Sequence, residues 1–191
     1  MGKKKKNDSG EEKKVRSKKR LMVLIILLAI LVPAITTQLF WFFGPGCVTK
    51  KNAIVKYYQA VENEDVSQVK KVSYPRKWQR NYEPNGQKID LDSVIEASFM
   101  YQSGASYSDV KIVSEQKLPS DSVNDFRRGI KDVYGVDLSI SEVCKVTFRM
   151  TVTLSSGQSQ DSGDIIRYLY RVGGKWFYLS DSLLQVHLDL D

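Results

Sequence analysis

The segment SEVCKVTFRMTVTL, residues 141–154, alternates between apolar and polar side chains with a period of two. This alternation predicts a long β-strand with one face against a core and the other toward solvent. The residues expected on the inner face are Cys144, Val146, Phe148, Met150, Val152 and Leu154. The residues expected on the outer face are Lys145, Thr147, Arg149, Thr151 and Thr153.

Further strands are predicted on both sides of this segment. Residues 108–117 (SDVKIVSEQK) precede it, and residues 164–172 (DIIRYLYRV) and 175–181 (KWFYLSD) follow it. The last two are joined by Gly173-Gly174, which is a strong signal for a tight hairpin. Residues 155–163 (SSGQSQDSG) are predicted as the turn after the long strand.

The part of the chain before these strands has a helical pattern. Residues 49–65 (TKKNAIVKYYQAVENED) place apolar side chains at helical spacing, with Thr49 as an N-cap. A second helix is predicted from Asp65 to the stop at Pro75. Residues 120–135 predict a capped helix that ends at a glycine, Gly135.

Two stretches lie between these helices. Residues 76–86 (RKWQRNYEPNG) are predicted as an irregular loop closed by a turn, and residues 90–104 as a helix capped by Asp92. Helices followed by a meander of strands predict an α+β domain, with helices packed on one face of a curved antiparallel sheet.

Three patches of the sequence resemble a known family. They are AIVKYYQAVENEDVSQV (residues 53–69), SEVCKVTFRMTV (residues 141–152) and YLYRVGGKWFYLSD (residues 168–181). The chain from about residue 49 to residue 181 resembles the nuclear transport factor 2-like, or cystatin-like, cone domains found behind membrane anchors in Gram-positive bacteria. The helix near residues 120–134 departs from the minimal pattern. The family contains enzymes, ligand binders and assembly modules, so the resemblance implies a fold and leaves the function open.

An apolar segment near the N-terminus predicts a membrane span. It begins at Leu21, ends at Phe43 and contains no charged residue. As a helix it is roughly 34 Å long, enough to cross a bilayer core of about 30 Å. Two alternatives stay open: a cleaved signal peptide, and a lipid anchor on Cys47. The predicted organisation is a basic tail (1–20), a span (21–43), a linker (44–48) and a domain (49–191).

The distribution of charge predicts the orientation. Residues 1–20 hold ten of the 29 Lys and Arg residues and three of the 22 Asp and Glu residues. The rest of the chain is therefore formally neutral, which argues against nucleic-acid binding by the main domain. The basic tail predicts a plasma-membrane protein with a cytoplasmic N-terminus and an extracytoplasmic domain.

The sequence contains few groups suited to catalysis or metal binding. It has one histidine, His187, and two cysteines, Cys47 and Cys144, far apart in the chain. We expect no His/Cys metal site, no cofactor and a surface role for His187. Asp90, Asp92 and Asp109 lie at expected element starts and are interpreted as caps. No carboxylate interrupts an apolar strand face, so an enzyme is the least favoured class. A structure with an ionisable group deep in the domain would revive that class.

Aromatic residues are the remaining candidates for a site. The residues expected to line a ligand pocket under the sheet are Tyr58, Trp78, Tyr82, Phe99, Tyr168 and Tyr170. The competing interpretation is that these side chains are ordinary core. Cys47 and Cys144 are a candidate disulfide in an exported domain, or else inert thiols.

These observations favour a single-pass membrane protein whose outer domain is a non-catalytic protein-interaction or assembly module. Its expected contacts are the bilayer and a protein partner or a second copy of the chain. The alternative is a module that binds a small molecule or lipid in the aromatic cone.

Overall fold

The computed structural model describes residues 29, 44–100 and 104–188. The chain divides into two units at Gly44, and every helix and strand named below belongs to the second unit, Pro45–Asp191.

The predicted membrane segment, residues 21–43, lies outside the described residues except for Ala29. In the part of the chain that is described, none of the helices has the length and apolar character that a bilayer crossing requires.

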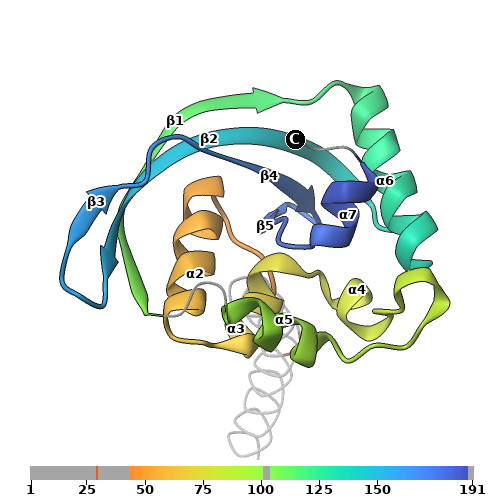
Figure 1. Cartoon of the computed structure of the whole chain (residues 1–191). Helices are drawn as coiled ribbons and strands as arrows, with labels where there is room; N and C mark the ends of the chain where they lie inside the picture. Colours follow the sequence, from red (N-terminus) through yellow and green to blue (C-terminus); the bar gives the residue numbers. More distant parts are fainter. Residues whose placement is uncertain (1–28, 30–43, 101–103, 189–191) are drawn as a thin grey trace, which may run out of the picture. The chain divides into compact units, whose positions relative to one another are not determined.

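Five strands form one antiparallel sheet. They are β1 (Ala105–Lys117), β2 (Ile140–Leu154), β3 (Ser159–Asp161), β4 (Ile165–Val172) and β5 (Lys175–Tyr178). The order across the sheet is β1-β2-β4-β5, and the short β3 pairs with β2. The long strands arch over the first described helix, α2 (Lys50–Glu62), drawn in orange in Figure 1. The predicted α+β class with a curved antiparallel sheet is confirmed.

The alternation predicted for the long strand holds in the middle of β2. Cys144, Val146 and Phe148 are almost fully buried, whereas Leu154 at the end of the strand is 42% exposed. The outer face is less polar than expected, because Val143 is also fully buried. Other elements must therefore pack against both faces of the sheet near the start of β2.

Aromatic contacts show what covers each face. Phe177 and Tyr178 are neighbours in β5, so their side chains point to opposite faces. Tyr178 stacks on Tyr57 of α2, with ring centroids 3.9 Å apart. Phe177 stacks on Tyr170 of β4, and that ring contacts Phe126 of α6 (Ser120–Tyr134). Helices α2 and α6 thus cover opposite faces, and the expectation that helices cover only one face is wrong.

The ends of the two longest helices follow from their sequence. The Thr49 side chain accepts a hydrogen bond from the Asn52 backbone N–H, 3.2 Å away, and so caps α2 as predicted. Helix α6 ends at Gly135, which has a φ of 66°, a left-handed conformation that glycine adopts at little cost. No side chain caps the start of α6, where Pro119 stands.

Three further helices in the described part of the chain are α3 (Val66–Ser73), α5 (Leu91–Phe99) and α7 (Ser182–His187). The N-cap of α5 is Asp90, whose side chain accepts from the backbone of Asp92 and Ser93, so the prediction that Asp92 is the cap is wrong. The last helix, α7, has no counterpart among the predicted elements.

Two other stretches are more regular than predicted. Residues 76–86, expected to be a loop, contain α4 (Arg76–Arg80) and a 3-10 turn, η1 (Pro84–Gly86). Helix α4 forms because it places Trp78 in the core, with 0% of its surface exposed. The predicted turn at residues 155–163 contains β3, a strand of three residues.

Candidate functional site

Two adjoining hollows lie where the segment between α4 and α5 passes α3 and the start of α7. We call them the charged groove and the tyrosine pocket. The charged groove, of about 620 Å³, is lined by Lys70, Gln79, Arg80, Tyr82, Glu83, Lys88, Ile89, Asp90, Leu91 and Asp92. The tyrosine pocket, of about 420 Å³, is lined by Tyr57, Val69, Tyr74, Tyr82, Pro84, Ile89, Val94, Ile95, Ala97, Ser98, Ser180, Asp181 and Ser182. Tyr82 and Ile89 line both.

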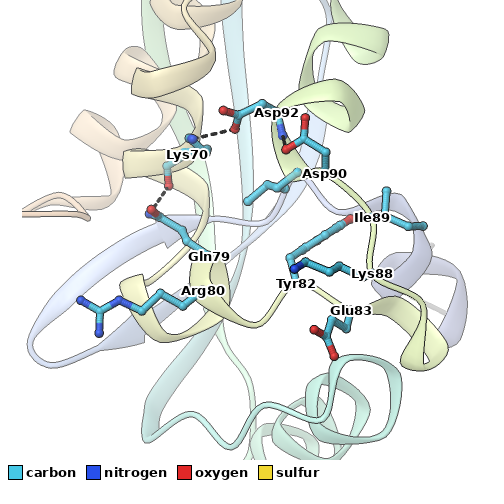
Figure 2. A pocket seen from close by; sticks show the side chains of 10 residues that line it. Lys70, Gln79, Arg80, Tyr82, Glu83, Lys88, Ile89, Asp90 and Asp92 are labelled. Atoms are coloured by element: carbon cyan, nitrogen blue, oxygen red, sulfur yellow. Dashed lines mark hydrogen bonds and ion pairs between the residues drawn. The ribbon is translucent and has the colours of Figure 1, made fainter.

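Polar contacts fix the walls of the charged groove. Figure 2 shows Lys70 of α3 and Asp92 of α5 facing each other, with Nζ and Oδ1 2.6 Å apart. The Gln79 side-chain amide donates to the backbone carbonyls of Lys70 and Tyr74, at 3.1 and 2.6 Å. These bonds hold α3, α4 and α5 together around the groove.

The charges of the groove balance. Its lining residues include three cations (Lys70, Arg80 and Lys88) and three carboxylates (Glu83, Asp90 and Asp92). A hydrogen bond from the Ser93 hydroxyl, with the backbone N–H of Asp92, holds the pKa of Asp90 below its usual value. Asp90 therefore stays ionised as the cap of α5. A groove with interspersed charges of both signs suits a polar protein surface better than a polyanion.

The tyrosine pocket has a buried floor and an apolar rim. On the floor, Tyr57, Tyr74, Tyr82 and Asp181 are all at least nine-tenths buried. At the rim, Ile89 and Val94 are 38% and 37% exposed. The pocket is thus more apolar than the adjoining groove and reaches further into the domain.

Asp181 is the feature of this pocket that the sequence analysis missed. It is 4% exposed, although no carboxylate interrupts an apolar strand face in the sequence. Its Oδ1 accepts from the Tyr134 hydroxyl at 2.5 Å and from the Leu184 backbone N–H at 2.9 Å. Its Oδ2 accepts from the Tyr82 hydroxyl at 3.1 Å. One carboxylate therefore joins α6, the segment after α4 and the start of α7.

The position of Asp181 in the chain explains part of this role. It directly precedes α7, so its bond to Leu184 N–H is an N-cap contact. An aspartate immediately before a Ser-Leu-Leu run is a signal for a helix start, and it could have identified α7 from the sequence. Nothing in that signal indicates the two tyrosines, which lie far away along the chain.

The surrounding tyrosines stay protonated at ordinary pH. Burial, and then the charge of Asp181, raise the pKa of Tyr74, Tyr82 and Tyr134. The hydroxyls of Tyr82 and Tyr134 therefore remain donors to the carboxylate. Asp181 is a buried ionisable group of the kind that would revive the enzyme class, but its described contacts, two tyrosine hydroxyls and the N-cap bond of α7, are structural ones.

The tentative aromatic ligand pocket is not formed as a single site. Trp78 and Tyr170 are fully buried, with ring centroids 6.1 Å apart, and belong to the packed core. Tyr58 packs among other aromatic rings of α2, β2 and β5, and Phe99 is buried at the end of α5. Tyr168 lies apart from them, half-buried, with the Lys145 ammonium 5.7 Å from its ring centroid. Among the six, Tyr82 alone lines the two hollows.

The two cysteines are free thiols, so the disulfide considered from the sequence is not formed. Cys47, expected in a linker, is buried and pairs through its backbone with Trp176 of β5 at two distances of 2.8 Å. Cys144 is 1% exposed on β2. Burial raises the pKa of both thiols, which makes them poor nucleophiles.

Asp109 and His187 are two other polar residues considered from the sequence. Asp109, expected to be a cap, lies inside β1 with a φ of 54°, where the register with β2 shifts. His187 is the last residue of α7. The described residues contain no group of three or more His, Cys, Asp or Glu side chains that could hold a metal ion.

Comparison with known proteins gives no relative from which a function could be transferred. No protein-family model, curated protein or solved structure matches this chain.

Proposed function

We propose that this chain is a single-pass membrane protein whose outer domain is a non-catalytic protein-interaction or assembly module. The observation that carries the proposal is the pair of adjoining hollows that share Tyr82 and Ile89. A groove of balanced charge beside a pocket with an apolar rim resembles the composition of protein interfaces, in which an apolar centre adjoins a polar margin.

The packing of the aromatic residues in the core supports the same proposal. Trp78, Tyr170 and Tyr58 pack against other rings, so the interior beneath the sheet is filled by side chains. Surface recognition then falls to the hollows at the α4–α5 segment. The resemblance to cone domains behind membrane anchors is compatible with this role, since that family includes assembly modules.

The membrane part of the proposal rests on the sequence. The uncharged segment 21–43 follows a tail rich in Lys and Arg, an arrangement that favours a cytoplasmic tail. Protease added outside intact cells should remove the domain and leave a small tagged N-terminal fragment in the membrane. Full protection of the domain, or its release without protease, would contradict the proposed topology.

Site-specific photocrosslinking in membranes tests the interaction. A photoreactive amino acid at Lys88, which is exposed in the charged groove, should give one discrete crosslinked product with a partner protein or a second copy. The control position is Val113, which is 54% exposed on β1 and lies outside both hollows. Equal labelling from the two positions, or none from Lys88, would count against the proposed interface.

A second function is favoured by one specific observation. The tyrosine pocket, of about 420 Å³, lies within the range of small-molecule sites. Native mass spectrometry of the full chain released from detergent would distinguish the two functions. A stoichiometric small added mass on the monomer supports ligand binding, whereas a bare dimer or higher oligomer supports assembly.

A further inference from the structure

The tyrosine pocket has an unusual distribution of charge. Among the described residues that line it, Asp181 is the one that carries a charge, and it lies on the buried floor. The other polar lining groups are serine and tyrosine hydroxyls, all of them neutral. The pocket therefore carries a net negative charge in largely apolar surroundings.

No cation of the described chain balances that charge directly. In the described part of the chain, ion pairs are formed by Glu115, Asp92, Glu142, Asp125 and Asp164. The three hydrogen-bond donors to Asp181 are the hydroxyls of Tyr82 and Tyr134 and the backbone N–H of Leu184. A buried carboxylate held only by neutral donors still attracts a cation, because the low-dielectric surroundings screen its charge weakly.

Asp181 also has acceptor capacity left. Each carboxylate oxygen can accept two hydrogen bonds, and Oδ2 receives one, from Tyr82. A further donor that enters the pocket can therefore bind without displacing a tyrosine.

The walls of the pocket suit the same kind of ligand. Tyr57, Tyr74 and Tyr82 line it, and the faces of aromatic rings attract ammonium groups. The rim residues Ile89 and Val94 offer apolar contact to the body of a ligand. A carboxylate, aromatic rings and an apolar entrance together select an ammonium group on a short apolar chain over a neutral or an anionic molecule.

We infer that the tyrosine pocket binds an organic cation, with its ammonium group toward Asp181 and the tyrosine rings and its apolar chain against Ile89 and Val94. A free alkylammonium compound and the side chain of a lysine present the same chemistry. The inference rests on the second function proposed above, the binding of a small molecule in this pocket, and names the chemical class of the ligand; crosslinking at the charged groove tests the protein interaction separately.

Calorimetric titration of the full chain in detergent tests the selectivity. Two probes are cations: choline, and N-acetyl-lysine amide, which carries the lysine side chain. The third probe is the neutral isostere of choline, 3,3-dimethylbutan-1-ol, in which a carbon atom replaces the quaternary nitrogen. At least one cation should bind about tenfold or more tightly than the neutral isostere. Choline as the tighter cation indicates a quaternary ammonium ligand, and the lysine amide as the tighter one indicates a primary ammonium group, such as that of a lysine side chain.

Two variants locate the binding. Asp181→Asn keeps an oxygen for the tyrosine hydroxyls and should remove the preference for a cation over the isostere. Ala97→Trp places a large ring at an exposed position of α5 that lines the pocket, and should abolish binding of every probe. Val113→Trp on β1 is the matched control and should bind like the parent.

Four results would overturn the inference. The first two are equal affinity of the parent chain for both cations and the isostere, and no binding of either cation at millimolar concentration. The other two are a cation preference that survives in folded Asp181→Asn, and one that survives in folded Ala97→Trp. If Asp181→Asn fails to fold, Ala97→Trp still tests the site, because that substitution leaves the contacts of Asp181 intact.

Discussion

Replacing Tyr134 by phenylalanine removes one hydroxyl from the Asp181 cluster and leaves the ring in place. The lost contact is a 2.5 Å hydrogen bond to a carboxylate, and Tyr134 is 3% exposed, so water cannot readily substitute for it. Hydrogen bonds to charged groups contribute roughly 1.5–3 kcal/mol. We therefore expect Tyr134→Phe to lower the free energy of unfolding by about 2 kcal/mol.

A double-mutant cycle separates this contact from general packing. In an Asp181→Asn background the acceptor is neutral, so the same Tyr134→Phe change should cost only about 1 kcal/mol. The coupling between the two positions is then about 1 kcal/mol. Tyr168→Phe is the matched control, since it removes the same atom from a half-buried ring outside the cluster.

Urea denaturation of residues 45–191, which form a compact unit of their own, measures all four corners of the cycle. The slopes of the transitions must agree before the midpoints are compared. The reasoning would be refuted by a Tyr134→Phe cost no larger than that of Tyr168→Phe, or by equal costs in both backgrounds.

Three further predictions follow from burial and backbone geometry. Burial raises the pKa of Tyr74 and Tyr178 well above 10.0, so the urea midpoint should fall as the pH rises above 10.0, where these tyrosines ionise in the unfolded chain but not in the folded one; a midpoint unchanged above pH 10.0 would contradict this. Gly46→Ala should lower the thermal midpoint by the equivalent of about 2 kcal/mol, because φ is +84° and a Cβ would lie 2.7 Å from Phe177 Cζ; unchanged melting would count against it. Cys47 and Cys144 should react with a thiol reagent only at the rate of unfolding, and fast labelling of the folded domain would contradict their burial.

The parts of the fold that the sequence predicts well have long periodic patterns. Strand β2 and helix α2 are 15 and 13 residues long, so local exceptions do not hide the period of their apolar residues. Helices α4 and α7 have five and six residues, too few for a period to be seen. The formation of α4 depends on a core position for Trp78 that only the folded chain supplies.

The site was harder to predict for a different reason. Asp181 was expected at the end of the predicted strand 175–181, but β5 ends at Tyr178, and Asp181 instead stands directly before α7. Its partners Tyr82 and Tyr134 stand 99 and 47 positions away in the sequence. No spacing rule joins residues that far apart, so the cluster follows from the packing of α6 against the end of the sheet. The number of aromatic residues suggested a ligand pocket. Composition alone does not distinguish aromatic residues that line a cavity from those that fill a core.

The pairing of Cys47 with Trp176 has a consequence for solubility. It places a backbone bridge beside β5, an end strand of the sheet, so part of that edge is not available to a second molecule. The opposite end strand, β1, pairs only with β2 among the described strands. Register shifts after Ser108 and Ile112 distort β1, and strands distorted in this way are poor templates for intermolecular sheet growth. Both margins of the sheet are thus protected against amyloid-like addition, one by a bridging segment and the other by irregular geometry.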